Sequence, residues 1–192
     1  MGALGFYYDN TTCTGCHACQ IACKDKNDLP LGILFRKVRT FEVGTFPNTK
    51  AFHSSGACNH CSSPACVANC PVGAMLICED GTVQHDDDVC IGCKTCVSAC
   101  PYGAPQFIEE DAIVRKCDSC KALRDNGQNP ACVDACVMRC LEFGDLDELK
   151  AKHGNNLVQE LPFLPSASIT NPSVLINCKE CSLNAAEKEG FC

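Results

Sequence analysis

The sequence contains no tryptophan, and aromatic residues make up only 6% of its 192 residues. No apolar run approaches the roughly 18 residues that a membrane-spanning helix needs. Lysine and arginine form no dense run, and the formal net charge is −7, so a nucleic-acid-binding surface is not expected. The sequence also lacks GxGxxG and GxxxxGK[ST] phosphate-binding loops and any nucleophile–base arrangement. With so few aromatic residues, something besides apolar burial must stabilise the fold.

Cysteine is the residue type that is present in excess. There are 21 cysteines, about 11% of the chain, which exceeds the roughly 8–10% that marks a cysteine-built scaffold. A disulfide framework is disfavoured because the count is odd and because no secretory signal is expected at the start of the sequence. The cysteines also come in tight groups, often two residues apart, which suits shared metal binding better than pairing with distant partners.

Sixteen of the cysteines form four groups of four. The first and third groups share the spacing C-x2-C-x2-C-x3-C, the second is C-x2-C-x4-C-x3-C, and the fourth has eleven residues between its two pairs. In chain order the groups are Cys13, Cys16, Cys19 and Cys23; Cys58, Cys61, Cys66 and Cys70; Cys90, Cys93, Cys96 and Cys100; and Cys117, Cys120, Cys132 and Cys136.

The C-x2-C-x2-C-x3-C spacing, with proline following, is the signature of bacterial ferredoxins that hold two [4Fe-4S] clusters. Soft thiolates suit iron in such clusters, and the first three cysteines of a run bind one cube while the fourth binds the other. The ligand sets predicted in this way are Cys13, Cys16, Cys19 and Cys136 (cluster 1); Cys58, Cys61, Cys66 and Cys100 (cluster 2); Cys90, Cys93, Cys96 and Cys70 (cluster 3); and Cys117, Cys120, Cys132 and Cys23 (cluster 4).

Zinc is the main structural alternative, because C-x2-C pairs also build zinc ribbons. Such ribbons give no reason for a third and a fourth cysteine at fixed offsets, so iron–sulfur clusters are favoured. His17 and His60 lie inside two of the groups. Neither is needed to complete a set of four, and both are expected to be exposed loop residues.

The pairing of the groups predicts an α+β fold of two bacterial 2[4Fe-4S] ferredoxin-like units, one inserted in the other. Residues 58–104 form the inserted unit, with a hairpin turn at Glu79–Gly81. Residues 1–57 plus 105–154 form the split unit, and 155–192 form an extended, loop-rich C-terminal arm whose three prolines argue against a further domain.

Five cysteines lie outside the four sets: Cys78, Cys140, Cys178, Cys181 and Cys192. When the repeats are aligned on their fourth cysteine, Cys140 falls at the position of Ala74 and Ala104. A free cysteine behaves as a small buried apolar residue, so Cys140 is expected to be a packed thiol. The other four are expected to be extra thiols, with Cys178 and Cys181 as a possible dithiol pair.

The segments between the groups carry further expectations. Residues 24–57 predict a β-hairpin over the cluster core, with Gly44 and Pro47 as breakers. Arg36, Lys37 and Arg39 are interpreted as solvated strand residues, the alternative being that they offset negative charge near a cluster. A short helix is expected over Asp145–His153 and is ended by Gly154.

The sequence resembles the four-cluster iron–sulfur subunits of the molybdopterin oxidoreductase family, especially its dimethyl sulfoxide reductase branch. The resemblance covers about 150 residues and includes GFYYDNTTCTGCHACQIACKDKNDL, DVCIGCKTCVSACPYGAPQ and FGDLDELKAKHG. Some relatives replace a cysteine of the third group and carry a three-iron cluster, whereas Cys93 is present here. The resemblance therefore implies four complete cubes.

The resemblance further implies an electron-transfer subunit that is not catalytic alone. Its partners would be a catalytic subunit with molybdopterin guanine dinucleotide, which reduces an S- or N-oxide such as dimethyl sulfoxide, and a quinol-oxidising membrane anchor. Cluster 1 would lie nearest the catalytic subunit. The alternatives are the same role in another molybdenum or tungsten complex, such as formate dehydrogenase or a polysulfide or thiosulfate reductase, and, more remotely, a zinc-stabilised binding module. The protein would be associated with a membrane only through its partners, on a side that the sequence does not determine.

Overall fold

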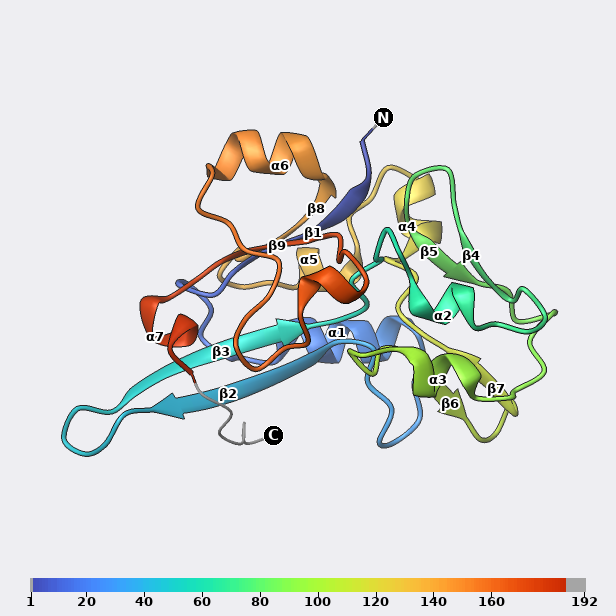
Figure 1. Cartoon of the computed structure of the whole chain (residues 1–192), viewed down its shortest axis with the longest axis horizontal. Coiled ribbons are helices and arrows are strands. Elements are labelled where there is room, and N and C mark those ends of the chain that lie inside the picture. The colour runs from blue at the N-terminus through green and yellow to red at the C-terminus, as the bar shows by residue number, and fades with distance from the viewer. Residues whose placement is uncertain (1, 186–192) are drawn as a thin grey trace.

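The computed structural model describes residues 2–185, and the centre of the fold is a three-stranded sheet (Figure 1). β1 (Leu4–Asp9) is the middle strand, antiparallel to β8 (Leu141–Asp145) and parallel to β9 (Val174–Asn177). Phe6, Tyr7 and Tyr8 of β1 are all buried, so this strand is covered on both faces. The sheet thus joins the beginning of the chain to two segments from its second half.

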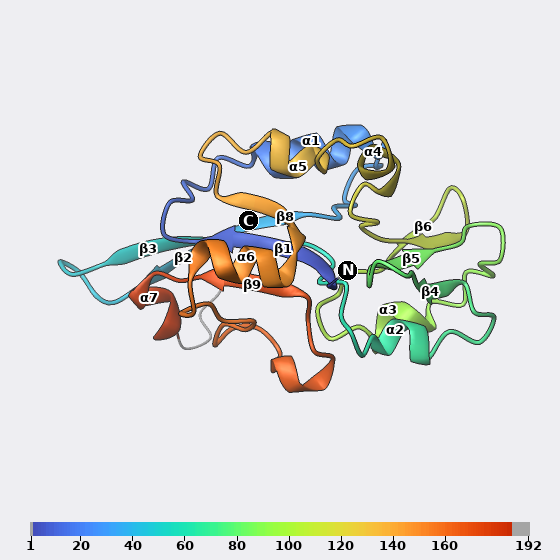
Figure 2. The ribbon, with the colours of Figure 1, turned by 90° about the horizontal axis from the view of Figure 1, so that it is seen from above.

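Two helices that are distant in sequence pack together on one side of this sheet. They are α1 (Ala18–Lys26), which follows the first cysteine loop, and α5 (Ala131–Asp134), within the fourth cysteine group. Figure 2 shows them side by side, with α4 (Lys121–Asp125) next to them. The buried residues of α1 and α5 are cysteines: Cys19, Cys23 and Cys132.

A second pair of helices packs at the other end of the molecule. α2 (Ala65–Ala68) contacts α3 (Thr95–Ala99), and β4 (Met75–Ile77) and β5 (Val83–His85) form the hairpin that the turn at Glu79–Gly81 predicts. Gly81 turns the chain there with a φ of 79°. This part of the fold follows the predicted order of loop, helix, hairpin, loop and helix.

A further hairpin, β6 (Gln106–Ile108) and β7 (Ile113–Arg115), belongs to the same end of the molecule. Val114 is buried in a core with Met75 and Val83, and Phe107 packs against that core. This hairpin lies beyond the predicted boundary at residue 104, so the hydrophobic core at this end extends further along the chain than the cysteine spacing indicates.

The expected hairpin within residues 24–57 is present as β2 (Lys37–Val43) and β3 (Lys50–Gly56). Val38, near its base, is buried in the same core as Cys19 and Cys23, while the tip projects away from the body (Figure 1). Phe41 and Phe52 stack across the two strands with ring centroids 5.0 Å apart, and Phe163 covers them.

The expected helix is α6 (Leu146–His153), capped by Asp145, whose carboxylate accepts from the N–H groups of Asp147 and Glu148. The segment that follows it differs from a simple arm. It contains a short 3-10 helix, η1 (Ala167–Ile169), the strand β9 and α7 (Glu180–Leu183). Leu175 and Ile176 of β9 are buried, because β9 completes the central sheet. No helix within residues 2–185 is long and apolar enough to cross a membrane.

Candidate iron–sulfur sites

Three hollows in the structure each bring together three cysteines of one group and one cysteine of another group. The first hollow contains Cys13, Cys16, Cys19 and Cys136; the second contains Cys58, Cys61, Cys66 and Cys100; and the third contains Cys70, Cys90, Cys93 and Cys96. These are the groupings that cross-ligation predicts for clusters 1, 2 and 3.

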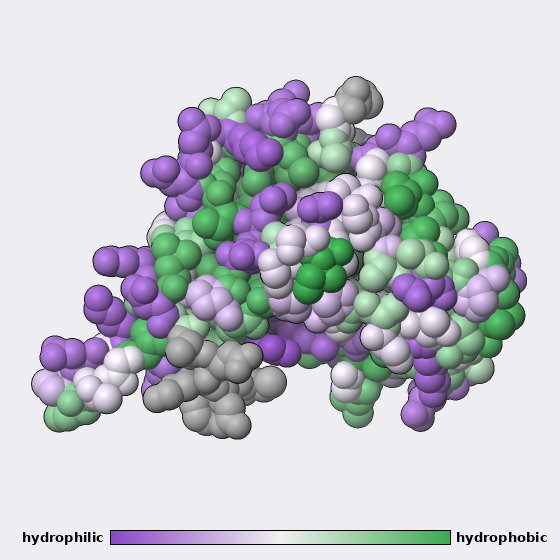
Figure 3. All heavy atoms as spheres, viewed as in Figure 1, coloured by the Kyte–Doolittle hydropathy of each residue, from purple (hydrophilic) through white to green (hydrophobic). Residues whose placement is uncertain are grey.

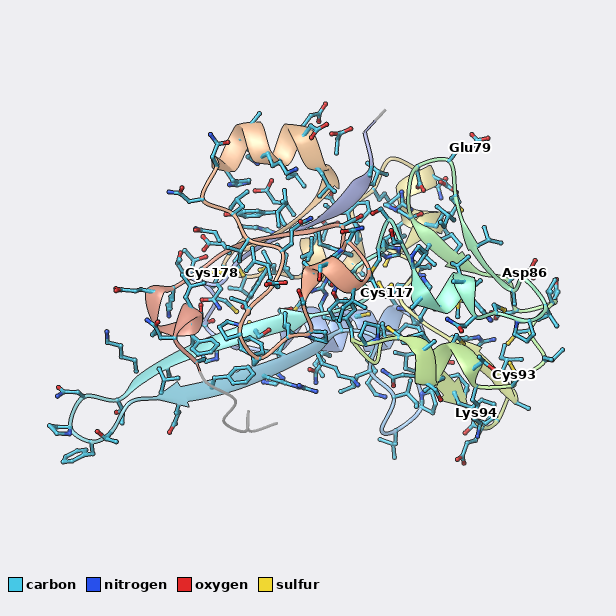
Figure 4. The ribbon with its side chains drawn as sticks, in the orientation of Figure 1. Glu79, Asp86, Cys93, Lys94, Cys117 and Cys178 are labelled. Carbon is cyan, nitrogen blue, oxygen red and sulfur yellow. The ribbon has the colours of Figure 1, made fainter. Side chains whose placement is uncertain are left out.

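The fourth predicted set lies deep in the core, where Cys23, Cys117, Cys120 and Cys132 are all buried. Burial, together with the neighbouring sulfurs of Cys132 and Cys120, raises the pKa of Cys23 to about 12. Four thiols in so confined a region repel one another when ionised, and a positively charged iron core would remove that cost. Figure 4 shows Cys117 near the centre of the molecule and Cys93 toward one end.

The first and third cysteine loops have the same backbone conformation. Gly15 and Gly92 both have φ of 67°, and His17 and Lys94, each just before a helix, both have φ of 61°. These left-handed residues curl each loop so that three cysteines face one hollow. A Cβ on Gly15 would lie 2.4 Å from the His53 ring, and one on Gly92 would lie 2.2 Å from the carbonyl oxygen of Ala112. Glycine is therefore required at both positions.

Backbone N–H groups supply hydrogen bonds to several of the sulfurs. The N–H of Ser119 donates to Cys117 Sγ over 3.4 Å, and the N–H of Cys140 donates to Cys136 Sγ over 3.3 Å. Burial raises the pKa of Cys70, but the N–H groups of Met75, Val72, Ala74 and Gly73 together lower it below the usual value. Soft thiolates with N–H donors around them are the donor set that iron–sulfur clusters use.

Cys140 lines the first hollow together with the four predicted ligands of cluster 1. Ala104 lines the second hollow and Ala74 the third, in agreement with the repeat alignment. Cys140 is buried, as expected for a packed thiol, but its Sγ also lies 3.3 Å from that of Cys136. The interaction of the Cys140 thiol with Cys13 lowers the pKa of Cys13 and raises the pKa of Cys140.

Two expectations about charged and polar side chains are wrong. His60 is fully buried, not exposed: its left-handed backbone, with φ of 43°, turns the ring inward, where Nδ1 accepts from the N–H of Val83. Arg36 is only 2% exposed, while Lys37 is half-buried and Arg39 is exposed. Arg36 lies in a bend just before β2, next to the buried Phe35, so the alternation of a strand gives no signal for its burial. His17 is half-buried.

The remaining thiols lie apart from the hollows. Cys78, Cys178 and Cys181 are half-buried, and Cys181 packs against the Phe41–Phe52 pair. In Figure 4, Cys178 lies on the opposite side of Cys117 from Cys93. Cys192 lies outside the described residues. Within residues 2–185, no three side chains of His, Cys, Asp or Glu are arranged to hold a single metal ion.

The four thiol sets form a continuous series. Cys96 of the third hollow and Cys66 of the second share one core. Cys58 of the second hollow lies in another core with Cys117 of the fourth set, and α5, which carries Cys132 of that set, packs on α1, which carries Cys19 of the first hollow. The order is therefore third hollow, second hollow, fourth set, first hollow. The two ends of this series are open to solvent, because Cys93 and Cys16 are both exposed.

Exposed apolar side chains lie beside both ends. Ile91 and Val72 line the third hollow, with Leu76 and Ile77 nearby on β4, and Figure 3 shows apolar surface at that end of the molecule. Beside the first hollow, Val137 and Met138 are exposed, as is Ile21 of α1. Apolar surface at both ends is the kind that partner proteins cover.

Family profiles match both parts of the chain that carry the cysteine groups. A family profile described as a 4Fe-4S dicluster domain matches residues 49–146, and one described as a 4Fe-4S binding domain matches residues 10–26. The chain is therefore an iron–sulfur protein with ferredoxin-type domains.

Curated relatives narrow this class. The protein is 42% identical to the iron–sulfur chain of the anaerobic dimethyl sulfoxide reductase of Escherichia coli, over 97% of this chain and 94% of that one. It is 38% identical to the corresponding chain of Haemophilus influenzae, over 100% and 97% of the two chains. It is also 38% identical to a subunit of the sulfite dehydrogenase of Allochromatium vinosum, over 77% of this chain and 71% of that one.

This protein belongs to the family of iron–sulfur subunits of anaerobic dimethyl sulfoxide reductase. These matches confirm the resemblance that the cysteine motifs indicate, and with it the role of an iron–sulfur electron-transfer subunit that is not itself the catalytic enzyme.

Proposed function

We propose that this chain holds four [4Fe-4S] clusters and conducts electrons between two partners. The ligands are the four predicted sets, namely the linings of the three hollows and the buried set of Cys23, Cys117, Cys120 and Cys132. The observation that carries the proposal is the continuous series of four thiol sets, which is exposed at both ends. With thiolate on every iron, none is left open for substrate, which suits electron transfer and not catalysis.

We also propose the inserted arrangement of two ferredoxin-like units. The packing of α1 on α5 supports a unit split between residues 1–57 and 105–154, and the packing of α2 on α3 supports a unit over 58–104. The β6–β7 hairpin lies against the second of these units. The segment after residue 154 adds β9 (Val174–Asn177) to the central sheet beside β1, which helps to hold the split unit together.

In the proposed mechanism, the bound clusters supply one-electron transfer, and the residues of the chain hold them in a row, exclude water and provide hydrogen bonds. The buried thiols of the fourth set make the middle of the path inaccessible to solvent. The exposed Cys16 and Cys93 lie at the two places where electrons can enter or leave. Four oxidised, fully thiolate-bound cubes would add a charge of about −8 to the chain, which the N–H donors of the loops partly offset.

The partners are proposed from the relatives. The likeness to the iron–sulfur chains of dimethyl sulfoxide reductase supports a molybdopterin catalytic subunit that reduces an S- or N-oxide, docked at the first hollow, and a quinol-oxidising membrane anchor as donor. The protein would then be membrane-associated through these partners. The likeness to a subunit of sulfite dehydrogenase supports the alternative of the same role in another oxidoreductase complex.

Anaerobic purification tests the cluster content. We expect about sixteen irons and sixteen acid-labile sulfides per chain, a broad brown absorption that bleaches with dithionite, and four one-electron reductions. Zinc without iron would contradict the proposal. Co-purification with the catalytic subunit, followed by assay with dimethyl sulfoxide, other oxides and sulfite, tests the assignment of the complex.

A further inference from the structure

Arg36 is a buried cation whose hydrogen-bonding capacity is only partly used. Its Nη1 donates to the carbonyl oxygen and the Oγ of Ser55, both over 3.1 Å, and its guanidinium lies 4.7 Å from the centre of the Phe6 ring. Its Nε and Nη2 atoms are buried and have no acceptor among the described residues. A buried charged group with two unused donors is costly unless something else accepts from it.

The surroundings of Arg36 indicate what that acceptor is. Burial lowers the pKa of Arg36, but the sulfurs of Cys132, Cys117, Cys19 and Cys23 raise it by more. Three of these cysteines belong to the fourth set, and Cys19 belongs to the first hollow. Ser55, which orients Arg36, also lies 3.4 Å from Cys19 Sγ. Within residues 2–185, no carboxylate forms an ion pair with Arg36.

Lys116 is also a buried cation beside a group of predicted ligands, those of the second hollow, but its hydrogen bonds differ from those of Arg36. Its Nζ donates to the carbonyl oxygens of Val83 and Cys117, beside the second hollow. The backbone therefore accepts from Lys116, whereas two nitrogens of Arg36 are left for an acceptor that residues 2–185 do not supply.

We propose that Arg36 is a positioning residue for electron transfer: it is the fixed counter-charge shared by the clusters of the fourth set and the first hollow, and its two free nitrogens would donate hydrogen bonds to the inorganic sulfides of those clusters. This inference rests on the proposed function. Reduction adds one electron and no proton to a cluster, so the charge near Arg36 becomes more negative by one. A nearby buried cation stabilises the reduced state more than the oxidised state, which raises the reduction potentials of these two clusters.

The test is an anaerobic redox titration of the complete chain with dithionite, followed by electron paramagnetic resonance, for wild type and for Arg36→Gln, Arg36→Lys and Arg39→Gln. Arg39 is the matched control, because it is exposed on the same hairpin. In Arg36→Gln we expect two of the four reductions to become less favourable by about tenfold, which is a downward shift of about 59 mV for one electron. Arg36→Lys should restore much of this shift, and Arg39→Gln should leave all four potentials unchanged.

Other results of the redox titration would contradict the inference. Unchanged reduction potentials in Arg36→Gln, or equal shifts of all four potentials, would overturn it. Iron loss in both Arg36 variants would also overturn it, because the guanidinium would then be needed only for its bonds to Ser55. Iron loss in Arg36→Gln with full iron and near-native potentials in Arg36→Lys supports a required positive charge. A wild-type protein without iron would contradict the proposed function itself, and the iron assay distinguishes that result from the others.

Discussion

The Sγ atoms of Cys136 and Cys140 lie 3.3 Å apart, although only Cys136 has a counterpart among the fourth cysteines of the other groups. The first hollow therefore contains five thiols, whereas the second and third hollows each contain four thiols and have an alanine at the position of the fifth. This short distance alone does not show which of the two cysteines would bind the cluster. The alignment of Cys140 with Ala74 and Ala104 favours a packed, non-ligand thiol at Cys140.

Cys140→Ala is expected to retain all four clusters, because alanine already occupies this position beside the other two hollows. Cys136→Ala is expected to lower the iron content by about four per chain. Iron and acid-labile sulfide assays on anaerobically purified protein measure both effects. Cys78→Ala, at a half-buried thiol outside the hollows, is the control. Loss of iron in Cys140→Ala would show that the alignment of the repeats is wrong.

Gly92→Ala should disrupt the third hollow. Its φ of 67° disfavours any Cβ, and the added atom would lie 2.2 Å from the Ala112 carbonyl oxygen. Gly127→Ala is the control, because Gly127 has φ of 73° and open space around its Cβ position. It therefore measures the free energy lost when a residue with a Cβ adopts a left-handed backbone, without a steric clash. The control should lose about 1–2 kcal/mol of stability and keep its iron. Gly92→Ala should be less stable than the control and should lose one cluster, as measured by anaerobic denaturant unfolding and iron assay.

Phe52→Ala should destabilise the β2–β3 hairpin without removing iron. Phe52 is fully buried, stacks on Phe41 and packs against Phe163, and truncation of such a side chain costs about 3–5 kcal/mol. Leu31→Ala, at a side chain that is 95% exposed, should change stability by less than about 0.5 kcal/mol. Equal stability of the two variants in urea unfolding would contradict the packing described for the hairpin.

Removal of iron with a chelator under reducing conditions should unfold the four short helices that lie beside the predicted ligands of the second, third and fourth cysteine groups. α2 and α5 have four residues each, and α3 and α4 have five, which is far too short for independent stability in water. The buried residues of α2, α3 and α5 are cysteines, so metal binding is expected to supply much of the folding free energy of this region. Far-ultraviolet circular dichroism should lose helical signal in parallel with iron, and an unchanged spectrum would contradict this expectation.

Cysteine spacing predicted the grouping of thiols because short loops restrict where neighbouring sulfurs can lie. Local turn and cap residues likewise predicted the β4–β5 hairpin and α6. The sequence did not indicate that His60 and Arg36 are buried, since polar side chains are usually exposed and only the folded environment reveals an inward orientation. β9 was not predicted as a strand because its four residues have no alternation and its partner, β1, lies at the other end of the chain.

The lining of the first hollow also constrains the order of events during synthesis. Cys13, Cys16 and Cys19 leave the ribosome early, but the hollow closes only when Cys136 and Leu141 have been made. The second and third hollows draw their cysteines from a single stretch, residues 58–100, so all eight of these thiols are available before Cys136 is made. We therefore expect a nascent chain to acquire iron first at the inserted unit, while the first cysteine loop remains open to oxidation or to a chaperone.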